Sequence, residues 1–97
     1  MKPIELAVSA LHDLEDIRIW YVDHQVPHIG ERLIRELSAK TEQLAEFPES
    51  GRVVPEFGVP TVRELIHPPY RLVYRNDPDT IWIVRVWRSE RLLGFVG

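Results

Sequence analysis

The sequence predicts an α+β fold in which an N-terminal strand and an antiparallel two-helix hairpin precede a three-strand antiparallel meander. Two patterns predict it. Apolar residues recur at helical spacing through residues 9–47, and bulky and polar residues alternate from Val62 to Trp87. Repeats, low-complexity tracts and long linkers are absent from the sequence, so we expect residues 1–97 to form a single domain around one mainly antiparallel sheet.

The first half of the chain predicts a strand followed by two helices. The stretch Pro3 to Val8 is short and apolar enough for a strand, and Ser9 offers an N-cap oxygen to the helix after it. We expect this helix to end within residues 23–25, and Pro27 to lie in the first turn of the next helix. The second helix should end at Phe47-Pro48, because proline disfavours helix in the residue before it.

The second half predicts the sheet. The stretch Arg52 to Thr61 contains two prolines and a glycine, so we interpret it as an ordered connection with one short extended piece. A proline pair and then an aspartate–proline turn separate the three strands that follow. The last of these strands is bulky on both faces, which is typical of a central strand. Two helices would cover one face of the sheet, and we expect the other face to stay open.

The composition excludes several classes of site. The chain has no cysteine, so neither a disulfide framework nor a thiolate metal site can form. The four histidines do not show a metal-binding spacing, and we expect no metal and no cofactor. The N-terminus lacks the apolar run of a signal peptide, and no segment approaches the roughly 18 apolar residues that span a bilayer. We therefore expect a soluble, cytoplasmic protein without a membrane partner.

Charge is unevenly distributed along the chain. The net charge of −3 argues against general nucleic-acid binding. Residues 1–60 hold six basic and eleven acidic groups, whereas residues 61–97 hold six arginines and four acidic groups. A guanidinium group pairs two oxygens at once and keeps its charge at physiological pH. We therefore expect the open sheet face to bind anionic groups of a target, through Arg52, Arg63, Arg71, Arg85, Arg88 and Arg91.

A family resemblance rests on three strings of residues, LAEFPESGRVVPEF, VRELIHPPYRLVYR and IWIVRVWRSERLL. Their order, together with the predicted strand, two helices and three strands, resembles the RelE/ParE superfamily of toxins from bacterial type II toxin-antitoxin modules. The resemblance implies a compact α+β toxin and a cognate antitoxin that wraps and neutralises it, in a dimer or a heterotetramer. It implies growth inhibition and plasmid stabilisation, through DNA gyrase for ParE or through ribosome-bound mRNA for RelE and YoeB.

The residues that the family places in its ribonuclease site are only partly present. Arg71 matches the sheet arginine that contacts phosphate, and Glu56 falls where YoeB-like members place a general base. Ser89 and Glu90 stand where those enzymes have a His-Tyr pair, and the two lysines, at positions 2 and 40, are far from the loop that supplies lysines in RelE. RNA cleavage needs a base and an acid, which arginines supply poorly.

The missing acid–base set favours a ParE-like toxin that binds gyrase and is not an enzyme. The alternative is a ribosome-dependent mRNA endoribonuclease with Glu56 and Arg71 as catalytic residues. A third reading is a binding module that is no longer toxic. A structural role also remains open for Arg63, Arg71 and Arg85, namely ion pairs with Glu56, Glu64 or helix carboxylates.

Overall fold

The computed structural model describes residues 1–89, which form two helices and a five-strand sheet. In chain order the elements are β1 (Ile4–Leu6), α1 (Val8–Asp23), α2 (Pro27–Glu46), β2 (Arg52–Val53), β3 (Val62–His67), β4 (Tyr70–Asn76) and β5 (Ile81–Arg88). The strands lie in the order β1-β5-β4-β3-β2, with β1 parallel to β5 and the other neighbours antiparallel. The α+β class and the mainly antiparallel sheet are therefore confirmed. The extended piece expected after residue 51 is β2 at the sheet edge.

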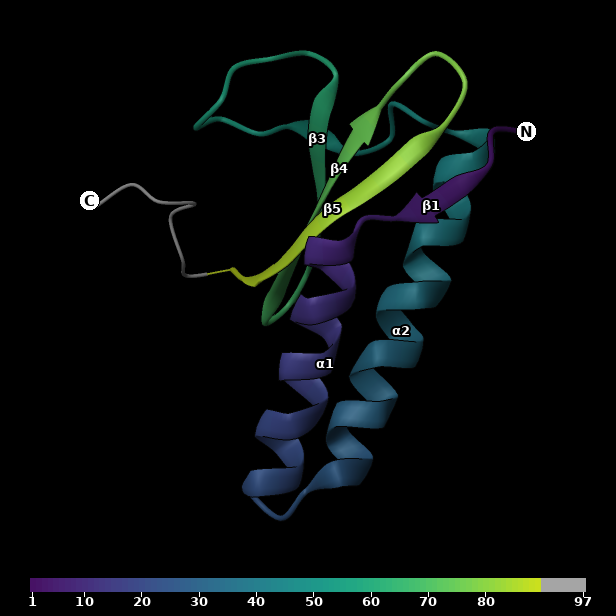
Figure 1. Ribbon diagram of the computed structural model, residues 1–97. Helices are drawn as coiled ribbons and strands as arrows, with labels where there is room; N and C mark the ends of the chain where they lie inside the picture. Colours follow the sequence, from purple (N-terminus) through teal and green to yellow (C-terminus); the bar gives the residue numbers. More distant parts are fainter. Residues whose placement is uncertain (90–97) are drawn as a thin grey trace.

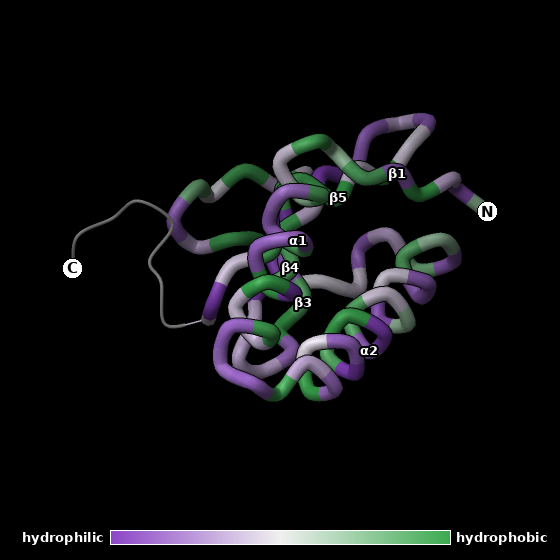
Figure 2. The backbone as a smooth tube through the Cα atoms, turned by 60° about the horizontal axis from the view of Figure 1, so that its bottom comes forward, coloured by the Kyte–Doolittle hydropathy of each residue, from purple (hydrophilic) through white to green (hydrophobic). Residues whose placement is uncertain are grey.

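The two helices form a hairpin on one face of the sheet (Figure 1). Figure 2 shows hydrophobic and hydrophilic positions alternating along α2, because its buried residues Leu33, Leu37 and Leu44 recur at helical spacing. Gly30 lets the helices approach closely, since a Cβ at this position would lie 2.9 Å from the Cβ of Tyr21. The two helices therefore pack closely against each other, and their apolar sides are buried against the sheet.

The helix boundaries agree with the sequence except at the start of α1. Pro27 opens α2, and α2 ends one residue before Phe47, as expected. The prediction that Ser9 caps α1 is wrong: the N-cap is Ala7, which makes no side-chain cap, and the Ser9 hydroxyl donates to the carbonyl of Val84 at 2.6 Å. That serine therefore links α1 to β5 instead of terminating a helix. In the described residues, no helix has the length and apolar character needed to cross a membrane.

Both faces of the sheet carry buried apolar side chains. The larger cluster lies under the helices and includes Leu72, Tyr74 and Ile83. On the opposite face Val54 and Val73 are fully buried and pack with the partly buried Val62, Val84 and Trp87. The connection between β2 and β3 supplies Val54, so it covers part of the face that the sequence led us to expect open.

Candidate functional site: a paired arginine and glutamate network

The strand register brings charged side chains together on the sheet face away from the helices. Arg52 of β2 lies opposite Glu64 of β3, and Glu64 lies diagonally from Arg71 of β4, which pairs with Ile66. Residues that are diagonal across an antiparallel pair share a face and are within reach of long side chains. The register therefore fixes one carboxylate between two guanidinium groups.

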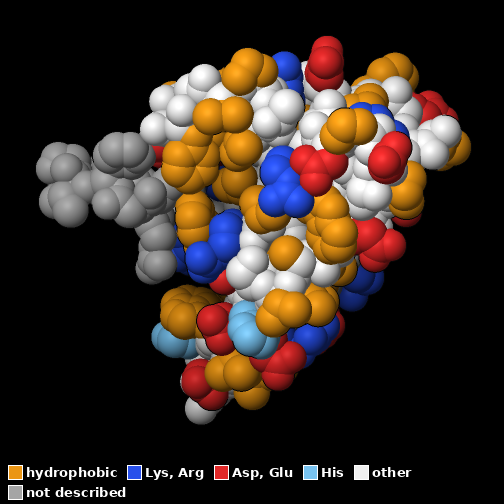
Figure 3. All heavy atoms as spheres, turned by 45° about the horizontal axis from the view of Figure 1, so that its top comes forward, with side chains coloured by type: hydrophobic (Ala, Val, Ile, Leu, Met, Phe, Trp, Pro, Cys, Tyr) orange, Lys and Arg blue, Asp and Glu red, His pale blue; other side chains and the backbone are white. Residues whose placement is uncertain are grey.

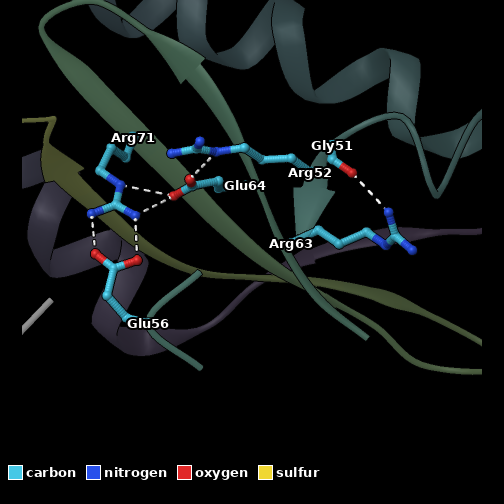
Figure 4. Close-up of polar contacts among 6 residues, drawn as sticks. All are labelled: Gly51, Arg52, Glu56, Arg63, Glu64 and Arg71. Atoms are coloured by element: carbon cyan, nitrogen blue, oxygen red, sulfur yellow. Dashed lines mark hydrogen bonds and ion pairs between the residues drawn. The ribbon is translucent and has the colours of Figure 1, made fainter. Parts of the chain in front are cut away.

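Arg71 is at the centre of this network and is only 3% exposed. Its Nε donates to Glu64 Oε1 at 2.7 Å, and its Nη1 and Nη2 donate to the two carboxylate oxygens of Glu56 at 2.9 and 3.0 Å (Figure 4). The Arg71 hydrogen bonds hold the pKa of Glu56 below its ordinary value, and the Glu56 carboxylate raises the pKa of Arg71 in turn. Arg71 is thus a buried cation held by two carboxylates.

Glu64 extends the network to the sheet edge. Its side chain is fully buried, and its second oxygen accepts from the Nε of Arg52, whose side chain is largely exposed. Two guanidinium groups therefore face two carboxylates, and the formal charges within the network cancel. We call these four residues, Arg52, Glu56, Glu64 and Arg71, the paired network.

Arg63 lies beside the paired network and binds backbone atoms instead. Its Nε donates to the Pro60 carbonyl at 3.0 Å, and its Nη1 donates to the carbonyls of Gly51 and Glu49 at 2.9 and 3.3 Å. Gly51 is required there, because a Cβ would lie 2.6 Å from the backbone oxygen of Glu64. Arg63 consequently ties the segment before β2 and the end of the β2–β3 connection to β3.

The remaining predicted arginines lie elsewhere. Arg85 donates from Nε and Nη2 to the two oxygens of Asp13 on α1, at 2.8 and 2.9 Å, and lies 4.4 Å from the Trp87 ring centroid. Arg88 is exposed at the end of β5, 5.8 Å from the ring centroid of Tyr70, and Arg91 lies outside the described residues. The structure therefore does not present the sheet arginines as one outward row. Arg71 and Arg85 are held in internal ion pairs, as the structural alternative proposed.

Comparison with known proteins assigns the chain to a family. Residues 4–93 match the family model described as the ParE toxin of the type II toxin-antitoxin system parDE. This chain belongs to the ParE toxin family. The toxin is 36% identical to toxin RelE2 of Caulobacter vibrioides over 84 residues, covering 86% of this chain and 90% of the relative. It is 33% identical to toxin RelE3 of the same organism over 94 residues, covering 92% and 96%.

A solved structure shares the fold of the toxin. It is a chain of the chromosomal ParDE toxin-antitoxin system from P. aeruginosa, matched with a TM-score of 0.76 at 24% identity over 91% of this chain and 96% of that chain. Together, the family match, the two relatives named RelE and this shared fold confirm the resemblance of the sequence to the RelE/ParE superfamily.

One polar side chain of the toxin with a structural role was not expected from the sequence. Asp13 was not singled out, although it lies on the buried side of α1 with Ala10 and Ile17, and a carboxylate at a core position signals a buried partner. It also accepts from the backbone N–H of Val86 at 2.8 Å.

Among residues 1–89, no cluster of three or more His, Cys, Asp or Glu side chains could hold a metal ion.

Proposed function

We propose that this type II toxin stops growth by binding DNA gyrase, without cleaving RNA, and that a cognate antitoxin neutralises it. The single observation that carries the proposal is the bidentate pair between Arg71 and Glu56. These are the two residues that RNA cleavage would require. In this toxin the guanidinium group of Arg71 and the carboxylate of Glu56 are hydrogen-bonded to each other. The membership of the chain in the ParE toxin family supports the same reading.

Glu56 is poorly suited to act as a general base in this arrangement. Both of its oxygens accept hydrogen bonds from Arg71, and its pKa is lowered by that contact. A base of lowered pKa has a weaker affinity for the proton that it must remove from a 2′-hydroxyl. Arg71 has the complementary problem, since a phosphate would have to displace two carboxylates to reach its donors.

The groups that could act as an acid are held away from this pair. His67 follows Leu65 by two residues in β3 and therefore points to the helix side of the sheet, where its Nε2 lies 2.9 Å from Glu36 of α2. Lys40 donates to the carbonyl of Ile66 at 2.9 Å. These contacts favour binding over cleavage as the mode of action.

The second candidate is a ribosome-dependent mRNA endoribonuclease that uses Glu56 and Arg71. Two relatives of more than 30% identity that carry the name RelE favour it. In this mechanism an incoming phosphate would take the place of the Glu56 carboxylate on Arg71, and the released Glu56 would take the proton of the attacking 2′-hydroxyl. The bond between phosphorus and the 5′-oxygen would break, and the leaving 5′-oxygen would take a proton from water.

One experiment separates the two candidates. Purified toxin is added to gyrase with relaxed plasmid, and in parallel to a translation reaction whose mRNA is mapped by primer extension, each with native toxin and with Glu56→Gln. Our proposal expects native toxin to block supercoiling at micromolar concentration and to leave the mRNA intact. Codon-linked cuts that disappear in Glu56→Gln, with unaffected gyrase, would establish the second candidate instead.

A further inference from the structure

The connection between β2 and β3 ends in an exposed apolar tip. Residues 57–61 are all exposed, and within them Phe57 and Val59 expose 47% and 44% of their surfaces. Hydrophobic side chains gather on this part of the surface in the space-filling view (Figure 3). Strand connections are usually polar, so two large exposed apolar side chains in one short connection favour an interaction site there. The residues Phe57, Gly58 and Val59 are called the loop tip below.

The backbone of the connection is held by hydrogen bonds at its base. The N–H groups of Phe57 and Gly58 both donate to the carbonyl of Val54, at 3.1 and 3.0 Å, and Gly58 adopts a φ of +64° that favours glycine. The N–H of Val62 donates to the carbonyl of Val59 at 3.0 Å. Val54 itself is fully buried on the sheet. The loop tip is therefore ordered before any partner arrives, which lowers the entropic cost of binding.

The paired network holds the residue next to the loop tip. Glu56 directly precedes Phe57, and its carboxylate is fixed to the buried Arg71. If the network performs no chemistry, this link has a positional role, because it fixes the direction in which the loop tip projects. The cancelled charges of the network leave little attraction for a phosphate backbone.

One guanidinium group lies at the base of the loop tip. Arg63 binds the carbonyl of Pro60, and its other contacts are backbone carbonyls as well, which carry no formal charge. An apolar projection with a guanidinium group at its base fits an apolar pocket with a carboxylate at its rim. Such a pocket is a feature of a protein surface and not of RNA.

We propose that the loop tip is the element that docks into the target protein, with Phe57 and Val59 filling an apolar pocket and Arg63 facing an acidic group at its rim. This inference rests on the proposed function, in which the toxin acts by binding a protein. Glu56 and Arg71 are positioning residues in this scheme, since they act on the target only through the loop tip. A pocket-filling aromatic residue at the centre of an interface commonly dominates its affinity.

The test compares two matched double variants of the full chain. Phe57→Ser with Val59→Ser removes the apolar tip, and Ile19→Ser with Val22→Ser removes two comparably exposed residues on α1. Each is expressed without antitoxin, growth is followed against inducer, and the thermal midpoint is measured on purified protein. We expect the tip variant to lose toxicity roughly tenfold or more with an unchanged midpoint, and the α1 variant to stay toxic.

The outcomes distinguish this inference from the proposed function. If native toxin does not inhibit gyrase but the tip variant alone loses toxicity, the docking role of the tip stands and gyrase is the wrong target. If gyrase is inhibited equally by native toxin and by the tip variant, the docking role is overturned and the target stands. Equal loss in the tip and α1 variants also overturns it, and a harmless native chain overturns both proposals.

Discussion

Replacement of Arg71 by methionine tests whether the paired network is a structural element. Arg71 lies between Glu56 and Glu64, whose side chains are 15% and 0% exposed. Removal of the guanidinium group leaves two carboxylates facing each other, and Arg52 then supplies the only remaining bond to Glu64 from within the network. Breaking a buried ion pair by removing one partner typically costs about 3–5 kcal/mol. We expect a destabilisation of this size in Arg71→Met.

The expected loss is large relative to the stability of a small domain. Domains of this size are usually stable by about 5–15 kcal/mol. Each kcal/mol shifts the thermal midpoint of a domain of roughly 100 residues by about 4–8 °C. The midpoint of Arg71→Met should therefore lie at least about 12 °C below that of the native toxin.

Urea denaturation of three proteins provides the measurement and its control. The third protein combines Arg71→Met with Glu56→Gln and Glu64→Leu, so that no carboxylate of the network remains unpaired. Replacement of a whole buried ion cluster by neutral groups is commonly tolerated, so the triple variant should recover most of the lost stability. The reasoning fails if Arg71→Met unfolds within about 1 kcal/mol of the native toxin, or if the triple variant is less stable than the single one.

Three further changes probe the same face and its link to the helices. Because the pKa of Glu56 is lowered, its ion pair stabilises the fold fully above the ordinary glutamate pKa, and this stabilisation is lost as the pH falls through the lowered value. Urea unfolding measured at a series of acidic pH values should show this loss for the native toxin and not for Glu56→Gln. Gly51→Ala should lower the thermal midpoint, because its Cβ would lie 2.6 Å from a backbone oxygen; an unchanged midpoint would contradict the crowding. Asp13→Asn should cost about 1–3 kcal/mol in urea, since it weakens a paired guanidinium contact and a backbone N–H bond, whereas Asp16→Asn should not.

The helices and strands could be predicted because their signals are local. Helical spacing gave α2, and the proline and aspartate turns gave the borders of β3, β4 and β5. The start of α1 was misplaced because a serine before a helix can cap it or bond elsewhere, and the carbonyl of Val84, 75 residues away, accepts the Ser9 hydroxyl. A contact of that range has no local pattern in the sequence.

The positions and partners of the arginine side chains could be predicted only in part. Alternation along β4 correctly placed Arg71 on the face away from the helices, because side-chain direction in a strand has a period of two. Its partners depend on two non-local facts, namely the diagonal register with Glu64 and the return of the connection that carries Glu56. The same pattern of residues is compatible with an open phosphate site or a closed ion network, and only the fold of that connection decides between them.

The closed network also changes what a loss-of-function variant would mean. In a ribonuclease, Glu56→Gln would abolish cutting, since the amide cannot take a proton, and it would also remove the ion pair with Arg71. In a toxin that docks through residues 57–59, the same change would weaken target binding and lower the thermal midpoint together, because Glu56 joins the connection to the buried Arg71. Toxicity alone cannot separate these roles. Lost mRNA cutting identifies a catalytic residue, and weakened target binding with intact mRNA identifies a positioning one.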